Sequence, residues 1–300
     1  MSQAGLPIVV GVDDSDQGRA ALDWALAEAE RRQAQVVIAH SWTPDNFAMP
    51  AVAGAIPDWS QSEELNKGNE AAARDWLAAL AARAGTSSGV TITTALNAGS
   101  PAGHLIGLAD GASMIVVGSR GRGGLKGLVL GSTSHQVASH ATCPVVVLRT
   151  NDDASDPKGP VVVGVDGSPA SNAALRAGYN EAQLRGAQLV LLHAWSTSFA
   201  GTLATTGASL ELVRAGEIDE GWRTLSESLI ALRAAGGTDV VVDERLVQGS
   251  PAAALVDASK GASLVVVGSR GLGGFKELML GSVSAAVLHH AHAPVMVIRT

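Results

Sequence analysis

The stretch Met114-Ile115-Val116-Val117-Gly118-Ser119-Arg120-Gly121, separated by nine residues from Gly131-Ser132, determines the fold expected of this chain. Four apolar residues that end in glycine are typical of a parallel strand buried on both faces. Glycines after such a strand let the backbone approach a ligand, and a helix that begins near Ser132 would offer free N–H groups to an anion. A tight strand-to-helix turn also needs glycine, so one copy of this pattern would leave both explanations open.

The same pattern recurs in the second half of the chain. Leu264-Val265-Val266-Val267 leads into Gly268-Ser269-Arg270-Gly271, and nine residues separate this stretch from Gly281-Ser282. The aspartates that follow the first apolar run of each half, Asp13 and Asp166, lie 153 positions apart, and the glycine motifs lie 150 apart. The chain is therefore a duplication of a unit of about 150 residues, not a solenoid of short repeats. Identical spacing in both copies favours a binding site over two structural turns.

Each half alternates short apolar runs with amphipathic stretches. In the first half, helical patterns separate five predicted strands, at residues 8–13, 36–40, 90–96, 114–117 and 144–148. Asp14 is the expected N-cap of the first helix, with Gln17 three residues later as in a capping box. Strands that alternate with helices predict a parallel sheet with right-handed crossovers and helices on both faces.

Length and composition predict a soluble protein of two domains. The 300 residues are 46% hydrophobic with a formal charge of −7, which argues against a nucleic-acid partner. Cys143 is the only cysteine, so no internal disulfide can form and a reducing compartment is expected. No apolar run reaches the roughly 20 residues of a membrane span, and residues 1–7 do not resemble a signal peptide. We expect a cytoplasmic protein without a membrane partner, with domains at 1–150 and 161–300 and a polar linker at 151–160.

The predicted topology brings an acid and a glycine loop together in each half. Ligands of open α/β sheets bind beyond the carboxyl ends of the strands, where the strand order reverses. Asp13 and the loop at 118–121 both follow carboxyl ends of strands. If the strand order is 3-2-1-4-5, those two strands are neighbours, and the acid faces the loop across one crevice. Asp166 and the loop at 268–271 predict a second crevice of the same kind.

Over nearly its whole length the chain resembles the universal stress proteins in their tandem, two-domain form. Besides the glycine motifs, the matching residues are Val10–Asp13, Val163–Ser168, His40, His193, Gly99–Pro101 and Gly249–Pro251. In that family the pattern Gly-x2-Gly-x9-Gly-(Ser/Thr) marks the members that bind ATP, and both halves contain it complete. The resemblance implies an α/β fold: two tandem repeats of an open five-stranded parallel sheet in the order 3-2-1-4-5, with helices on both faces, adenine nucleotide alpha hydrolase-like. It also implies that the fifth strands pair, either between the tandem halves or across a dimer.

The resemblance further implies one ATP site in each half, with Mg²⁺ held by the phosphates. The residues that correspond to the phosphate contacts are Gly118, Gly121, Gly131 and Ser132, and in the second half Gly268, Gly271, Gly281 and Ser282. Thr133 and Val283 follow the serines and are expected to add a backbone contact. No metal site made of protein side chains alone is expected, because the histidines at 289, 290 and 292 fit no common spacing.

The remaining expected contacts lie at the other end of each nucleotide. Asp13 and Asp166 correspond to the residue beside the ribose or a phosphate-bound metal. Ser41 and Ala194 correspond to the position whose backbone meets adenine.

Three functional hypotheses follow from these sites. The first is a nucleotide-binding regulatory module of the stress response, in which ATP biases a surface that an unknown protein partner or a second copy in a homodimer recognises. The second is a slow ATPase, in which Asp13 and Asp166 orient metal or water. No residue set looks like a nucleophile with its base, so no catalytic residue is assigned and at most weak ATPase activity is expected. The third is a nucleotide-free assembly or chaperone-like protein with vestigial loops.

Overall fold

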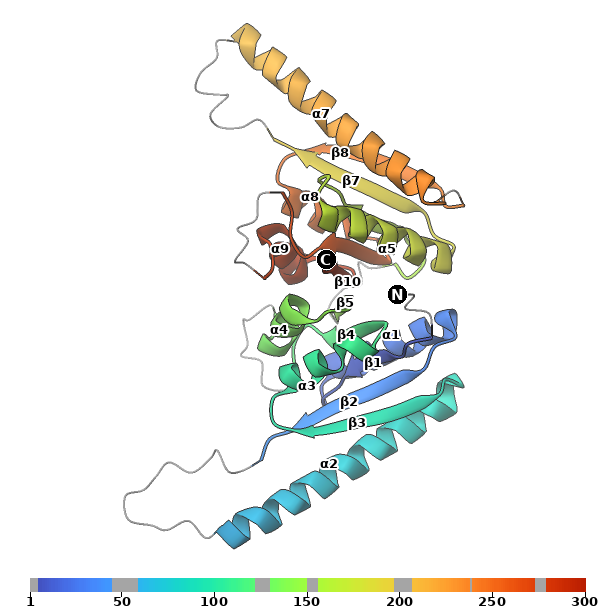
Figure 1. Ribbon diagram of the computed structural model, residues 1–300, viewed down its shortest axis with the longest axis vertical. Coiled ribbons are helices and arrows are strands. Elements are labelled where there is room, and N and C mark those ends of the chain that lie inside the picture. The colour runs from blue at the N-terminus through green and yellow to red at the C-terminus, as the bar shows by residue number, and fades with distance from the viewer. Residues whose placement is uncertain are drawn as a thin grey trace, which may run out of the picture.

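One sheet of ten strands organises the part of the chain that the structure describes (Figure 1). The computed structural model describes residues 5–44, 59–121, 130–149, 156–196, 207–237, 239–272 and 279–300.

Each half supplies five strands to this sheet. Those of the first half are β1 (Ile8–Gly11), β2 (Val36–Trp42), β3 (Ile92–Ala98), β4 (Met114–Gly118) and β5 (Val145–Leu148). Those of the second half are β6 (Val161–Gly164), β7 (Leu189–Trp195), β8 (Val242–Gln248), β9 (Leu264–Gly268) and β10 (Val295–Ile298). Within each half the neighbours are parallel, and the order β3-β2-β1-β4-β5 is repeated as β8-β7-β6-β9-β10. The predicted fold class and strand order are confirmed.

The two halves meet edge to edge. β5 pairs with β10 in antiparallel orientation, with Val146 opposite Met296. Both strands are buried along their length, which is typical of the centre of a sheet and not of an edge. This pairing covers an edge that would otherwise be open in each half, and it places the two halves about an approximate two-fold axis (Figure 1).

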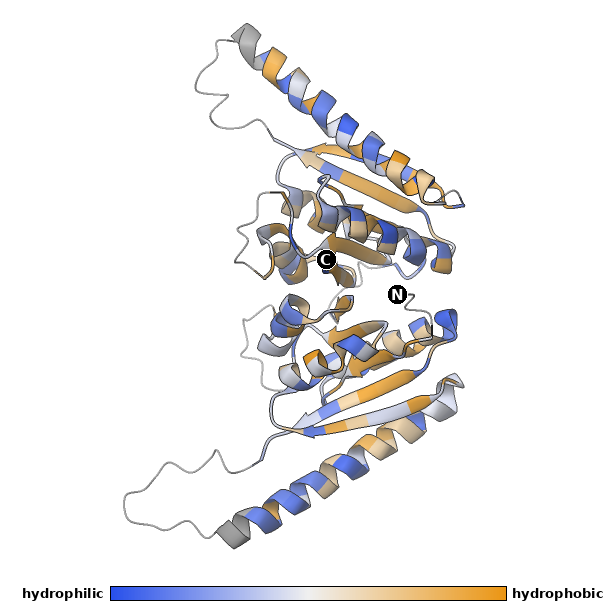
Figure 2. Ribbon diagram, viewed as in Figure 1, coloured by the Kyte–Doolittle hydropathy of each residue, from blue (hydrophilic) through white to orange (hydrophobic). Residues whose placement is uncertain are grey.

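Helices cover both faces of the sheet. One face carries α1 (Asp16–Arg32), α2 (Trp59–Ser88), α5 (Pro169–Arg185) and α7 (Gly207–Ala234). The other carries α3 (Pro101–Gly107), the short 3₁₀ helix η2 (Ala109–Gly111), α4 (Ser132–His140), α8 (Pro251–Ala258) and α9 (Ser282–His290). Each face has one hydrophobic core that runs through both halves. In Figure 2 the strands are mostly hydrophobic, whereas α2 and α7 alternate in polarity and extend outward from the two ends of the sheet.

Helix starts agree with the sequence in one place and differ in another. Ser100 caps α3 by accepting a hydrogen bond from Gly103 N, and Pro101 begins the helix, as the Gly-Ser-Pro motif predicts. The expected N-cap of α1 at Asp14 is wrong: Ser15 is the cap, and its hydroxyl accepts from Gly18 N at 3.0 Å. A serine oxygen one position later can reach the first-turn N–H, while the Asp14 carboxylate pairs with Arg19.

Other boundaries shift by a few residues. The third strand begins at Ile92, two residues later than predicted, and continues to Ala98. The division into domains at 1–150 and 161–300 stays a prediction, and residues 151–155 of the expected linker lie outside the described residues. No helix among the described residues combines the length and the apolar character needed to cross a bilayer.

Candidate functional site

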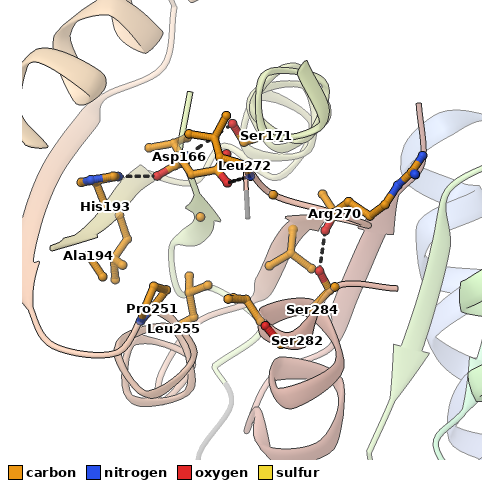
Figure 3. A pocket seen from close by; sticks show the side chains of 18 residues that line it. Asp166, Ser171, His193, Ala194, Pro251, Leu255, Arg270, Leu272, Ser282 and Ser284 are labelled. Atoms are coloured by element: carbon orange, nitrogen blue, oxygen red, sulfur yellow. Dashed lines mark hydrogen bonds between the residues drawn. The ribbon is translucent and has the colours of Figure 1, made fainter. Parts of the chain in front are cut away.

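A cavity of about 480 Å³ opens at the carboxyl ends of β6, β7 and β9 in the second half (Figure 3). This is the edge of the sheet where the strand order reverses. The cavity is lined by all of the residues predicted for this half: Asp166, Ala194, Gly268, Gly271, Gly281, Ser282 and Val283. In Figure 3, Asp166 lies opposite Ser282, with Ala194 and Pro251 between them on a third side.

The acid and the glycine loop are in direct contact in both halves. A Cβ built on Gly271 would lie 2.4 Å from Asp166 Oδ2, and one built on Gly121 would lie 2.5 Å from Asp13 Oδ2. Any larger residue there would have to displace the carboxylate. The structure therefore brings together the residues that the topology argument predicted to face each other, and it gives the second glycine of each motif a steric reason.

Asp166 is held as an ionised acid. Its carboxylate accepts hydrogen bonds from Ser168 N and Leu272 N, each at 3.0 Å. Burial raises the pKa of this carboxyl, but the hydrogen bonds from Ser168, Leu272 and Ser171 outweigh burial and leave the pKa below its usual range. A negative group beside a phosphate cradle suits a ribose hydroxyl or a phosphate-bound cation, because it would repel a bare phosphate oxygen.

The helix that follows each glycine loop begins without a side-chain cap. Gly131 and Gly281 are the N-caps of α4 and α9 and offer no side-chain oxygen to the first turn. Among the described residues, no acceptor takes the first-turn N–H groups of Ser132 and Thr133 or of Ser282 and Val283, so these groups can serve another acceptor. A helix start of this kind favours an anion.

A serine that sequence reasoning missed holds each glycine loop against its helix. Ser134 and Ser284 each donate from the hydroxyl to the carbonyl oxygen of the motif's first glycine, at 2.6 Å. Both serines are buried. Their recurrence three residues after Gly131 and Gly281 was the signal in the sequence that could have identified them. The interior of both loops, residues 122–129 and 273–278, lies outside the described residues.

His40 and His193 are structural, and each lies two residues before the end of its strand, because β2 continues to Trp42 and β7 to Trp195. His193 Nδ1 lies 2.7 Å from the carbonyl oxygen of Val165, and His40 Nδ1 lies 2.9 Å from that of Val12. A carbonyl oxygen can only accept, so each Nδ1 carries a proton and its ring is fixed against the strand that bears the acid. This arrangement supports the position of Asp166 and Asp13 without giving either histidine a free reactive nitrogen at Nδ1.

The two halves differ where the adenine contact was expected. Ala194 lines the second-half cavity, whereas the Ser41 hydroxyl lies 3.2 Å from His104 Nδ1. Burial, and the positive charge that His40 can carry, lower the pKa of His104 and outweigh its hydrogen bond to the His40 backbone. His104 was missed in the sequence because its counterpart in the second half is Ala254.

Comparison with known proteins settles the family. The model of the universal stress protein family matches residues 6–149 and again residues 159–299. The chain belongs to the universal stress protein family. A universal stress protein of Mycolicibacterium smegmatis is 37% identical over 294 residues, which cover 97% of this chain and 96% of that protein. Another, from Mycobacterium tuberculosis (strain ATCC 25618 / H37Rv), is 35% identical over an alignment of 317 residues, gaps included, that covers 99% of this chain and 96% of that protein.

Solved structures support the arrangement of both halves. The crystal structure of a universal stress protein from Archaeoglobus fulgidus DSM 4304 matches 98% of this chain and 98% of its own, with a TM-score of 0.68 and 19% identity. At that identity the likeness shows the fold alone. Since the match covers 98% of each chain, the tandem arrangement is shared as well as the single unit.

Proposed function

We propose that this universal stress protein binds ATP at one site in each half and acts as a nucleotide-dependent regulatory module in the cytoplasm. The observation that carries the proposal is the second-half cavity, where a glycine loop, an uncapped helix start and an ionised acid converge. Its volume of about 480 Å³ lies within the usual range for small-molecule sites.

Each wall of the cavity suits one part of a nucleotide. The backbone of Gly268 and Gly271 and the start of α9 would bind the phosphates, with Mg²⁺ held by the phosphates themselves. Asp166 would accept from the ribose hydroxyls or bind that cation. The backbone at Ala194 would meet the adenine, with the apolar side chain of Leu255 beside it.

The first half carries the corresponding set: Asp13, Ser41, Gly118, Gly121, Gly131, Ser132 and Thr133. Its acid and glycine loop are in the same contact as in the second half. One site per half would therefore give two ATP per chain. A protein partner or a second copy in a homodimer would read the state of these sites.

A slow ATPase is the second candidate, and Asp166 is the observation that favours it. An ionised carboxylate beside the phosphate cradle could orient water or a metal ion. The carboxylate accepts two backbone N–H groups from its own loop and the glycine loop, which fits a binding role better than proton transfer. Release of ADP instead of ATP from the purified protein would favour hydrolysis.

The test begins with the nucleotide that the purified protein releases on denaturation, identified and counted by chromatography. About two ATP per chain are expected. Ser132→Glu and Ser282→Glu then each place a negative charge at the start of α4 or α9, where acids do not disturb the helix but would repel phosphate. Each variant should lose one of the two equivalents, and the uncharged Ser132→Gln and Ser282→Gln variants are the matched controls. Full binding by both charged variants would refute the placement of the phosphates.

A further inference from the structure

The glycine loops of the two halves differ in one buried contact. In the first half, Gln17 from the first turn of α1 lies against the loop with 8% of its surface exposed. Its Oε1 accepts from the Ser119 hydroxyl at 3.0 Å and from the backbone N–H of Arg120. The Arg120 N–H can only donate, so the atom that faces it must be the amide oxygen and not the nitrogen, and the Ser119 hydroxyl then donates to the same oxygen.

The residue that corresponds to Gln17 in the second half cannot make this contact. Ala170 stands at the position of Gln17, 153 residues later, and its methyl group cannot accept a hydrogen bond. Among the described residues, neither the Ser269 hydroxyl nor the Arg270 N–H donates to a protein acceptor. Arg270 lines the cavity, and its side chain points away from it in Figure 3.

Ser119 with Arg120 in the first half, and Ser269 with Arg270 in the second, are the variable positions inside Gly-x2-Gly, in the middle of the loop expected to bind phosphate. A phosphate oxygen that accepts from them would form charge-assisted hydrogen bonds, which are among the stronger ones in proteins. In the second half the Arg270 N–H has no acceptor among the described residues, and Arg270 lines the cavity, so this donor can serve such an oxygen; Ser269 is buried and does not line the cavity. In the first half a phosphate would have to displace the Gln17 oxygen, or lie beside the negative end of its carbonyl dipole.

We propose that the two nucleotide sites are unequal, that the second-half site binds ATP more tightly, and that Gln17 against Ala170 sets the difference. This inference rests on the proposed ATP binding. Gln17 acts on the loop and would not contact the adenine or ribose, so it is a positioning residue. The chain would thus fill its second-half site at low ATP and its first-half site only when ATP rises, which would give one module two thresholds.

Isothermal titration of the nucleotide-free full chain with ATP and Mg²⁺ tests this directly. Two classes of site are expected, with dissociation constants about tenfold or more apart, as expected for one charge-assisted hydrogen bond. Ser282→Glu should remove the tight class and Ser132→Glu the weak one, which assigns each class to a half.

Reciprocal substitutions then exchange the two loops. Gln17→Ala should tighten the first-half site about tenfold, and Ala170→Gln should weaken the second-half site by a similar factor. Gln17→Met is the matched control for packing, because it keeps the length of the side chain and removes the acceptor, and it should behave like Gln17→Ala. The ¹⁵N–¹H signal of Arg120 in the nucleotide-free protein should shift in both Gln17 variants and exchange faster with solvent, a readout that needs no ligand.

Three outcomes would overturn the inference. Equal affinities that Gln17→Ala leaves unchanged would refute it while the proposed function stands. Weaker ATP binding in Gln17→Ala and Gln17→Met would mean that Gln17 orders the loop for its ligand, which reverses the proposed sign. Absence of ATP binding at both sites would refute the proposed function together with the inference.

Discussion

Removal of Arg185 should destabilise the whole chain, because this residue belongs to a buried ion cluster between the halves. Glu28 and Arg32 on α1 face Glu181 and Arg185 on α5, and the two pairs are related by the same offset of 153 residues. Arg185 donates to Glu28 Oε2 at 2.8 Å, and Arg32 donates to Glu28 Oε1 at 2.6 Å. Each arginine also pairs with Glu181. Every charge in this cluster therefore has partners in both halves.

The cluster is largely buried from solvent, so each charge depends on the others, and not on water, for its stabilisation. The Glu28 side chain has no exposed surface, and that of Arg185 is 5% exposed. Burial raises the pKa of Glu28, but the guanidinium groups of Arg185 and Arg32 outweigh burial and hold this pKa below its usual range. The loss of one partner would leave a buried carboxylate without its compensating charge, at a cost of about 3–5 kcal/mol.

Arg185→Met keeps the length of the side chain and removes its charge. Glu28 would keep Arg31 and Arg32, but the buried Glu181 would keep only Arg32, which it shares with Glu28. We expect the free energy of unfolding to fall by about 3–5 kcal/mol, a large part of the roughly 5–15 kcal/mol of a typical domain. Guanidinium denaturation followed by circular dichroism measures this change. Arg74→Met is the matched control: it breaks the pair of Arg74 with Glu70 on the exposed face of α2, where a loss of less than about 1 kcal/mol is expected.

A second substitution distinguishes a lost charge from lost packing. Glu28→Leu in the Arg185→Met background removes one of the two carboxylates left behind, so the double variant should be more stable than the sum of the single changes predicts. The reasoning is refuted if Arg185→Met costs no more than Arg74→Met, or if the two changes in the cluster are strictly additive.

Three further predictions concern single residues. Burial raises the pKa of Cys143 to about 11, two units above the reference value of 9.0, so the thiolate form is about a hundredfold less populated. Iodoacetamide at pH 8 should therefore alkylate Cys143 far more slowly in the native protein than in denaturant. The pKa of His104 is lowered from 6.5, so the unfolded chain binds more protons and the free energy of unfolding should fall as the pH drops below about 6.5. His104→Ala places the residue of the second half, Ala254, at this position. It should reduce the difference in the free energy of unfolding between pH 7.5 and pH 5.5, measured by denaturation curves, and an unchanged difference would mean that other groups cause the pH dependence. Gly271→Ala should weaken ATP binding at the second-half site in the titration described above, because its methyl group would displace Asp166, and unaltered binding would exclude a role for that contact.

The sequence predicted the sheet well because its strands are short, apolar and repeated. Runs such as Met114–Val117 and Leu264–Val267 have no polar residue that could tolerate solvent, so burial on both faces was the only arrangement available. The duplication confirmed each assignment with a second copy. Asp13 and Gly121 came together as expected because topology alone fixes which strand ends are neighbours.

The contacts that the sequence did not reveal depend on side-chain direction. Gln17 fitted a capping box by its spacing, yet its amide reaches the glycine loop about 100 residues further along the chain. The charged residues Glu28 and Arg185 lie on helices whose pattern predicts only an amphipathic face. Their pairing depends on how α1 and α5 approach across the junction of β5 with β10, and no local pattern encodes this approach.

The duplication constrains the interface and the two sites differently. In the ion cluster at the interface, Arg32 pairs with Glu28 of its own half and with Glu181, the equivalent residue of the other half, and Arg185 pairs with the same two carboxylates. A change in one half therefore alters contacts in both. Glu28 with Glu181 and Arg32 with Arg185 are accordingly the same residue types in both halves. On the opposite face, Arg149 and Arg299 each donate to a carbonyl oxygen in the last turn of the other half's helix, at His289 and Ser139.

The expected site residues of the two halves share no member, so one site can change without the other. Gln17 against Ala170 and Ser41 against Ala194 are differences of this kind, and both lie where a nucleotide would be bound. Symmetry at the interface thus fixes how the halves are held together, while asymmetry at the proposed sites would let one half respond where the other does not.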